Sequence, residues 1–506
     1  MRTNLFYFYL FLSLNCRIFV DRICYNHSDN YIDINIYVYA IFNQMIHFEE
    51  NAEIDYFVDS LELFYDIQWL YNAPVTEILV KRYLESCPDG WMECLKNSQN
   101  QELNDFVSRK LVQMNWPESL KRFVEKCNTL DRLPRANPAF SIQLPECFLK
   151  GINKKKQHEI IHLAQLVHEQ CRAHKLENII DLGAGLGYIC QLLHHLYGYK
   201  VLGLEANIKN VNCANNRQNN LYPKSKKQVQ YVWCKITNNY VKTIESILQK
   251  SAVTEKFCLI GLHACGDLSI YASEIFSKMK AARLLILISC CYHKLSLVSN
   301  SQDMTGKEYF ENFPISRALK TAAGRCNLDI GLFLRRPFLR LACQEPAARW
   351  DNKSEHFHSE HSFYVLARAI LELYAKQNRL CLKKNVRKAT RKSQCLNFST
   401  YLKDSLKRYT FERIVEESDK SISCMITITE DLQKDIMSLW EKYEHKLKAV
   451  EVYTGLQLLL QSPAESLILM DRVCWLKEHG FPTEILPVMS EKLSPRSQAI
   501  VSRKHQ

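Results

Sequence analysis

A glycine-rich turn between an apolar run and a helical segment constrains the fold of this chain more than any other feature. The run Asn178–Leu182 contains the acid Asp181, and Gly183, Gly185 and Gly187 follow it at alternate positions. Glycines carry no side chain, so backbone N–H groups at the start of the next helix can approach a ligand closely. The sequence therefore predicts a strand, a ligand-binding turn and a helix in direct succession.

Further strands and helices alternate around this turn. Short apolar runs separated by helical segments lie at 200–204, 229–233, 257–262 and 284–288. This alternation is typical of a doubly wound, mostly parallel α/β sheet. Two short runs in the tail, TEILPVM and QAIVSRK, are expected to be the last strands of the same sheet. We predict a Rossmann-like seven-stranded sheet with a helical N-terminal domain and a helical insertion before the last two strands.

The expected domains follow from changes of pattern along the 506 residues. That length exceeds a single simple domain and suggests a core with additional modules. The predicted segments are an apolar N-terminal extension (1–44), a helical N-terminal domain (45–150), the Rossmann-like core (151–377), a basic linker with a helical insertion (378–462), and a C-terminal helix with strands that complete the core (463–506).

The N-terminus carries an apolar run, Leu5–Leu14, behind Arg2. This run fits a secretory signal within residues 1–20 or a short anchor, but Asn15 and Arg17 leave it too short to span a bilayer comfortably. We favour translation from Met45, because 20 cysteines without a C-x-x-C pair or a closely spaced framework suit a reducing compartment. A cytoplasmic or nuclear protein is expected, without integral membrane association unless the apolar run is retained.

An acid at the end of the next strand narrows the choice of ligand. Glu205 lies 24 residues after Asp181, where its carboxylate can accept both hydroxyls of a ribose. A dinucleotide fingerprint would place its third glycine at position 188, which is Tyr188 here. The D-x-G-x-G-x-G spacing favours S-adenosylmethionine over NAD. The predicted cofactor-binding residues are Asp181, Gly183, Gly185, Gly187 and Glu205, and the adenine contact stays unassigned.

Two polar clusters follow the fourth and fifth strands, at 263–267 and 290–293. Because ligands bind at the carboxyl ends of parallel strands, both clusters are expected beside the methyl group of the cofactor. Asp267, His263 or His293 could take a proton from an attacking nucleophile. The alternative is that the cysteines only pack and the histidines cap strand ends.

A metal site is the third possibility for these clusters. Two histidines with two or three cysteines could ligate a metal, but the H-x-C and C-x-H spacings are tight for tetrahedral zinc. We therefore expect no metal. The candidate catalytic residues are Asp267, His263, His293 and Cys265.

Five segments together resemble the methyltransferase-like protein 25 family, whose members are also called ribosomal RNA adenine dimethylase domain-containing proteins. In matching order, within about residues 50–504, these segments are Lys154–Glu159, Asp181–Gly187, Gly261–Ser269, Cys290–His293 and Leu493–Arg496. The resemblance implies a Rossmann-like methyltransferase domain, S-adenosylmethionine as cofactor and a cytosolic or nuclear protein. From the first segment we add Lys156 and His158 to the cofactor-binding candidates.

The resemblance implies no substrate. The N-P-P-Y signature of adenine-N6 enzymes is absent after the fourth strand, which counts against methylation of a base amine. A weaker likeness to a family of transfer RNA 2′-O-methyltransferases lies in the C-G motif after the fourth strand and the Cys-Cys-His segment after the fifth. That likeness favours RNA, and a hydroxyl over an amine.

A basic stretch at 379–392 is the candidate surface for RNA phosphates. The net charge of +12 permits a polyanionic partner without requiring one. A solvated, partly disordered insertion explains the stretch about equally well. A protein or small-molecule methyltransferase, and a non-catalytic protein that keeps the cofactor fold for assembly, remain alternatives. The basic residues are Arg379, Lys383, Lys384, Arg387, Lys388, Arg391 and Lys392.

Overall fold

The structure is a computed structural model that describes residues 51–135, 142, 144–236, 240–251, 253, 256–298, 306–386, 397–417 and 420–504. The chain divides into two compact units, Met1–Asp55 and Tyr56–Gln506. The predictions for residues 1–44 lie outside the described residues. In the described part of the chain, no helix combines the length and the apolar character needed to cross a membrane.

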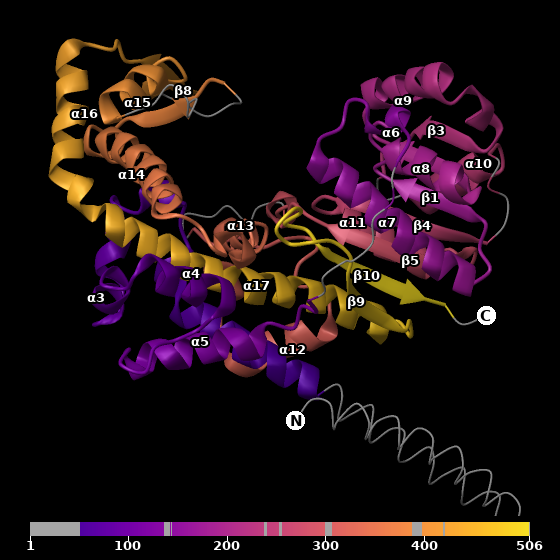
Figure 1. Cartoon of the computed structure of the whole chain (residues 1–506), viewed down its shortest axis with the longest axis horizontal. Helices are drawn as coiled ribbons and strands as arrows, with labels where there is room; N and C mark the ends of the chain where they lie inside the picture. Colours follow the sequence, from indigo (N-terminus) through magenta and orange to yellow (C-terminus); the bar gives the residue numbers. More distant parts are fainter. Residues whose placement is uncertain are drawn as a thin grey trace, which may run out of the picture. The chain divides into compact units, whose positions relative to one another are not determined.

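Seven strands form one sheet in the order β3-β2-β1-β4-β5-β10-β9 (Figure 1). The first five strands in this order are parallel to one another, whereas β10 is antiparallel to both β5 and β9. The predicted mostly parallel sheet, completed by two C-terminal strands, is therefore confirmed. The strands are β1 (Asn178–Leu182), β2 (Lys200–Glu205), β3 (Val229–Trp233), β4 (Phe257–Ala264), β5 (Ala282–Ser289), β9 (Thr483–Pro487) and β10 (Gln498–Arg503).

Strand β1 lies between β2 and β4, so the strand order reverses beside it. Every residue of β1 is buried, as a strand covered on both faces requires. In an open α/β sheet, ligands bind outside the carboxyl ends of the strands at such a switch point. The fold thus places the Asp181–Gly187 turn where a cofactor is expected.

Helices cover the sheet and bury its apolar side chains. Helices α7, α8 and α9 pack on one face in a core that includes Leu163, Ile189 and Val211. Helix α11 packs against β4 and β5, and α10 packs against α11. These helices are α7 (Lys154–Ala173), α8 (Tyr188–Tyr197), α9 (Ile208–Leu221), α10 (Tyr240–Leu248) and α11 (Leu268–Lys278), with the short α6 (Glu146–Leu149) before them.

The long helix α17 (Leu447–Glu478) connects the N-terminal helices with the end of the sheet. It packs against α3, α4 and α5 and also against β9, β10 and α11. Side chains are buried all round this helix, including the charged Glu465, Asp471 and Arg472. The N-terminal helices are α3 (Trp91–Lys96), α4 (Asn100–Arg109) and α5 (Glu118–Leu130).

The segment before α17 contains a second sheet as well as helices. Strands β6, β7 and β8 form a three-stranded antiparallel sheet that the sequence analysis did not predict. Strand β6 was not predicted because its charged residues Lys383 and Lys384 break the alternation of apolar and polar residues that indicates a half-buried strand. The elements of this region are α12 (Arg317–Cys326), α13 (Arg336–Ala342), α14 (Glu355–Gln377), β6 (Cys381–Lys384), α15 (Phe398–Ser405), β7 (Tyr409–Glu417), β8 (Lys420–Met425) and α16 (Glu430–Tyr443).

Candidate functional site

The turn after β1 is held against the end of β2 by its own backbone. The N–H groups of Gly183 and Ala184 donate to the carbonyl of Leu204 over 2.8 and 3.1 Å. The N–H of Gly185 donates to Oε2 of Glu205 over 2.9 Å. These bonds fix the turn and the Glu205 carboxylate relative to each other.

The three glycines of the turn have positive φ angles, and two of them serve different purposes. A Cβ on Gly187 would collide with the ring of Tyr231, whose hydroxyl donates to the Gly187 carbonyl over 3.1 Å. A Cβ on Gly185 would meet no atom nearer than the Gly183 carbonyl at 4.0 Å. Gly187 is therefore required by packing, whereas Gly185 leaves open space that a ligand can occupy.

Asp181 is buried with one unsatisfied oxygen. Its Oδ2 accepts a hydrogen bond from Sγ of Cys190 over 3.2 Å, while its Oδ1 has no partner among the described residues. Burial raises the pKa of Asp181 to about 6. A buried polar atom without a partner is costly, and a cationic or hydrogen-bonding ligand would satisfy it. This orphan oxygen fits the amino group of a bound S-adenosylmethionine.

Glu205 is half-buried at the end of β2, and its Oε1 accepts from the N–H of Asn207 over 2.8 Å. Trp233 ends the neighbouring strand and pairs with Glu205 in the register of the sheet. The side chains of Trp233 and Ile208 are 55% and 51% exposed, although both are apolar. The indole of Trp233 donates from Nε1 to the carbonyl of Ala206 over 2.9 Å, so its exposed ring gives an apolar surface beside the carboxylate, where an adenine ring could stack. The sequence analysis left the adenine contact unassigned. The exposure of the Trp233 side chain, which the sequence does not reveal, is what suggests this residue for the contact.

The two candidates from α7 differ in their position. Lys156 lies close enough to Asp181 for their charges to interact, and burial lowers the pKa of its ammonium group. His158 instead accepts a hydrogen bond from the N–H of Ser490 over 3.0 Å, and its ring lies 4.1 Å from that of His162. The structure therefore brings Lys156 to the turn, while His158 holds the loop that precedes β10.

His263 is turned toward a buried glutamate of α7. Its Nε2 lies 3.0 Å from Oε2 of Glu159, and Ser494 donates to Oε1 of the same carboxylate over 2.9 Å. Burial alone would raise the pKa of Glu159, but the hydrogen bond from His263, with the nearby charges, lowers it to about 2. This arrangement orients the His263 ring. Sequence reasoning quoted Glu159 in a motif without giving it a role.

Asp267 binds the loop that follows β5. Its Oδ2 accepts from the N–H and the hydroxyl of Ser296 over 3.0 and 2.7 Å, and its Oδ1 accepts from Nδ2 of Asn312 over 2.8 Å. Both oxygens are thus engaged in holding this loop. The geometry supports a positioning role for Asp267 more directly than proton transfer.

Cys265 and His293 lie on the adjacent loops after β4 and β5. Sγ of Cys265 is 2.8 Å from Sγ of Cys290, and this hydrogen bond lowers the pKa of Cys265 to about 6. Nδ1 of His293 is 3.1 Å from Sγ of Cys343. Burial and the guanidinium of Arg340 lower the pKa of His293, so its ring is neutral at pH 7 and able to accept a proton.

Two motifs of the sequence analysis meet at a second buried glutamate. Glu465 of α17 accepts from Oη of Tyr292 over 2.8 Å and from Nη1 of Arg496 over 2.6 Å. Tyr292 belongs to the Cys-Cys-Tyr-His segment, and Arg496 ends the Leu-Ser-Pro-Arg segment. This buried network fixes the loop after β5 against α17, which explains both residues structurally.

A basic cavity of about 610 Å³ lies next to these loops. Arg336, one of its lining residues, donates from Nη1 to the carbonyl of His293 over 2.6 Å. Five cations and two acids contribute to the wall, so its formal charge is positive. These residues are Lys81, Arg335, Arg336, Arg340 and Arg368, with Glu77 and Glu308.

Only part of the predicted RNA surface at 379–392 is described. Within that part, Nζ of Lys383 forms an ion pair with Oε1 of Glu412 over 3.2 Å, and Lys384 is exposed on β6. The residues Arg387, Lys388, Arg391 and Lys392 lie outside the described residues. The basic stretch as a whole stays a prediction.

Comparisons with known proteins agree with this site. A family described as a methyltransferase domain matches residues 155–298. The protein named probable methyltransferase-like protein 25 from Homo sapiens is 27% identical over 254 residues, which cover 50% of this chain and 38% of that protein. Its Mus musculus counterpart is 28% identical over 256 residues, with the same coverage. The match thus spans well under half of the length of these relatives.

Among solved structures, YjhP from E. coli is 14% identical, with a TM-score of 0.20 and coverage of 30% of this chain and 58% of that one. M. capricolum TrmK, solved with S-adenosylhomocysteine, is 15% identical, with a TM-score of 0.18 and coverage of 25% and 57%. Scores this low support no conclusion about this chain.

The sheet order, the glycine turn and the matched domain agree with one another. They support S-adenosylmethionine as the cofactor and a transferase as the class of enzyme. The relatives match this chain across half of its length, and the methyltransferase-domain family matches residues 155–298, which contain the turn and Glu205. Over half of its length the chain is similar to the proteins named probable methyltransferase-like protein 25, and its residues 155–298 match a methyltransferase domain.

Proposed function

We propose that this protein is an S-adenosylmethionine-dependent methyltransferase that acts on a hydroxyl group of RNA. The observation that carries the RNA assignment is the basic cavity that adjoins His293 through Arg336. The bound cofactor would supply an electrophilic methyl group. The remaining parts of the reaction depend on residues of this chain.

Cofactor binding depends on the turn and on the strand ends beside it. The open space at Gly185 admits the ligand, and the carboxylate of Glu205 accepts hydrogen bonds from ribose hydroxyls. The orphan oxygen of Asp181 accepts from a cationic amine. Trp233 and Ile208 stack on the adenine.

A hydroxyl nucleophile requires a proton acceptor, because a neutral alcohol attacks slowly. His293 is suited to this role because its lowered pKa keeps the ring neutral, and Cys343 fixes the ring through Nδ1. The guanidinium of Arg336 anchors the His293 backbone. This chain therefore positions a base on a loop that Arg336 joins to the wall of the basic cavity.

Substrate binding depends on exposed cations that line the cavity. Within the described residues, the side chains of Lys81, Arg340 and Arg368 form no hydrogen bond or ion pair with protein groups, and all three are exposed. Free cations that converge on one cavity favour an anionic ligand, and a chain of phosphates is the anion that RNA presents.

We also propose a cytoplasmic or nuclear location. Sixteen described cysteines are free, and two of them lie only 2.8 Å apart at the site. Such thiols persist in reducing compartments. Fractionation of cells that express the tagged protein tests this location, and recovery in a secreted or luminal fraction would contradict it.

The cofactor is tested by calorimetric titration of S-adenosylmethionine into the full chain. Gly185→Ala is expected to weaken binding at least about tenfold, since the added Cβ enters the open space of the turn. Gly198→Ala is the matched control, because Gly198 also has a positive φ but ends α8 away from the turn. Equal affinity for both variants would contradict the assignment of the turn.

The substrate is tested by methyl transfer from labelled S-adenosylmethionine to total cellular RNA, and by RNA binding at two salt concentrations. The charge reversals Arg340→Glu and Arg368→Glu together should abolish binding, while Lys383→Glu and Lys384→Glu test the rival surface on β6. Binding should weaken steeply with salt if phosphates are contacted. If the protein binds the cofactor but neither binds nor methylates RNA, the assignment of RNA as substrate is wrong, and the cofactor assignment is unaffected.

A further inference from the structure

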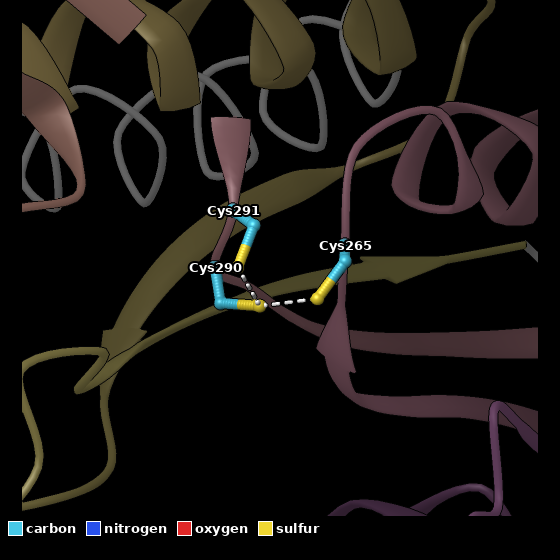
Figure 2. Close-up of side chains that lie close together, drawn as sticks. All are labelled: Cys265, Cys290 and Cys291. Atoms are coloured by element: carbon cyan, nitrogen blue, oxygen red, sulfur yellow. Dashed lines mark hydrogen bonds between the residues drawn. The ribbon is translucent and has the colours of Figure 1, made fainter. Parts of the chain in front are cut away.

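Three cysteine thiols from two loops converge at the carboxyl edge of the sheet (Figure 2). Cys265 follows β4, and Cys290 and Cys291 follow β5. Sγ of Cys290 lies 2.8 Å from Sγ of Cys265 and 3.6 Å from Sγ of Cys291, and the three sulfur atoms all lie within 4.8 Å of one another. Figure 2 shows the Cys265 and Cys290 side chains pointing toward each other from opposite loops.

This spacing fits a single soft metal ion. Thiolates bind Zn²⁺ at about 2.3 Å, so two thiolates of a tetrahedral site are separated by about 3.8 Å. The separation between Cys290 and Cys291 already has nearly this value, and the separation between Cys265 and Cys290 needs to lengthen by only about 1 Å. Three sulfur ligands exclude the hard cations Mg²⁺ and Ca²⁺, which prefer oxygen.

The backbone brings the two loops together before any metal binds. The N–H of Gly266 donates to the carbonyl of Cys291 over 3.3 Å, and a Cβ on Gly266 would lie 2.7 Å from the carbonyl oxygen of Lys294. Only glycine permits this close approach next to Cys265. The close backbone contact at Gly266 therefore holds the two loops, and with them the three thiols, next to each other.

The structure removes the objection that the sequence raised against zinc. That objection rested on the tight H-x-C and C-x-H spacings of His263 and His293. Both histidines have other partners, because His263 binds Glu159 and His293 binds Cys343. The ligand set consists of three thiols from two loops, and no sequence spacing restricts it.

We propose that Cys265, Cys290 and Cys291 bind one Zn²⁺ ion and leave its fourth coordination position open. Binding releases the protons of the thiols that are still protonated, and no group is oxidised or reduced. Three thiolates and Zn²⁺ carry one net negative charge, which the nearby ammonium group of Lys294 offsets. Partial exposure of Cys265 and Cys291 leaves access for the fourth ligand. Three protein ligands with an open position are typical of catalytic rather than structural zinc.

This proposal is independent of the RNA assignment and is tested with the metal alone. The full chain is reduced, supplied with Zn²⁺, desalted and analysed for metal, and its affinity is measured against a chromogenic chelator. We expect about one Zn²⁺ per chain. Each of Cys265→Ser, Cys290→Ser and Cys291→Ser should weaken binding at least about 100-fold. Cys326→Ser is the matched control, since Cys326 is also a partly exposed free thiol but ends α12, outside the trio.

A second measurement needs no variant. Wild-type protein loaded with Co²⁺ in place of Zn²⁺ should show the intense thiolate-to-metal absorption of a three-sulfur site. Because this measurement uses the unaltered chain, misfolding of a serine variant cannot affect it. Absence of bound metal in the reduced chain, or retention of metal by Cys290→Ser, would overturn the proposal. A Cys265–Cys290 disulfide in the unreduced protein, without metal binding after reduction, would overturn it in favour of a redox pair.

Discussion

His263 and Glu159 are 104 residues apart in the chain, yet Nε2 of His263 lies 3.0 Å from Oε2 of Glu159. His263 reaches this position through a positive φ of 65°, at a register shift between Leu262 and Ala264. A left-handed backbone is strained for a histidine and persists where the surroundings enforce it. Glu159, which also accepts from Ser494, is therefore a positioning residue that fixes the end of β4.

The first prediction concerns the pH dependence of this contact. The pKa of Glu159 is lowered to about 2 from its usual 4.5, so its carboxylate stabilises the fold above pH 4.5 and loses this effect as the pH falls through 2. Glu159→Gln should cost about 2 to 3 kcal/mol at pH 7. Thermal unfolding of both proteins from pH 7 to pH 3 measures this cost.

The difference between the unfolding midpoints of wild type and Glu159→Gln should shrink toward pH 3. Glu169→Gln is the control, because Glu169 lies on the same helix, is exposed, and accepts a hydrogen bond from Gln165 at the surface. A difference that stays constant with pH would show that the charge of Glu159 does not contribute.

The second prediction separates stability from cofactor binding at Asp181. Burial raises the pKa of this carboxyl to about 6 from 3.8, so its ionisation destabilises the fold as the pH rises from 3.8 to 6, and the full cost remains above pH 6. Asp181→Asn should therefore stabilise the cofactor-free protein at pH 7 by about 2 kcal/mol, while weakening S-adenosylmethionine binding.

Thermal unfolding with and without the cofactor measures both effects of Asp181→Asn. The gain in the unfolding midpoint should vanish at pH 4, where the wild-type carboxyl is already protonated. A variant that is less stable than wild type at pH 7 would mean that the hydrogen bond from Cys190 and the charge of Lys156 outweigh the cost of burying the carboxylate.

Much of the fold was predictable because its signals are local. The alternation of apolar runs with helices, together with the glycine turn, predicted the sheet and its C-terminal strands, and the structure confirms both. The three-stranded sheet was not predicted, since β6 is short and basic. The extent of α17 was also missed, because the helix contains Pro463 and is buried on all sides, so its sequence lacks one continuous polar face.

The candidate site was predictable only where the residues in contact lie close together in the sequence. The Asp181–Gly187 turn and Glu205 were found from their spacing, and the structure places them together. The partners of His263 and Tyr292 come from α7 and α17, and no spacing in the sequence links such distant segments. The roles assigned to the individual site residues stay predictions.

The third prediction concerns the apolar surface beside Glu205. Trp233→Ala should raise the dissociation constant of S-adenosylmethionine about tenfold, because about 1 kcal/mol of aromatic stacking is lost. The unfolding midpoint should change little, since the side chain is 55% exposed. Met114→Ala is the control, because Met114 is 95% exposed and lies in the N-terminal helical region. Unchanged affinity of Trp233→Ala would place the adenine elsewhere.

The fourth prediction tests the glycine that joins the two loops of the thiol cluster. An alanine at Gly266 would be strained by its φ of 54°, and its Cβ would lie 2.7 Å from the backbone oxygen of Lys294. Gly198→Ala carries the same kind of strain at a φ of 77° but meets no atom within 4 Å. The comparison of the two variants therefore isolates the contact between the loops from the strain of the backbone.

Gly198→Ala should cost about 1 kcal/mol and Gly266→Ala about 2 kcal/mol more, because the backbone of Lys294 cannot yield as a flexible side chain would. Thermal unfolding of the two variants measures this difference. Separation of the loops should also make Cys265 and Cys290 react faster with a thiol reagent, while the thiols of Gly198→Ala react as in wild type. Equal stability and equal thiol reactivity of the two variants would mean that the loops are held together without Gly266, and that the cluster depends on the Tyr292–Glu465 network instead.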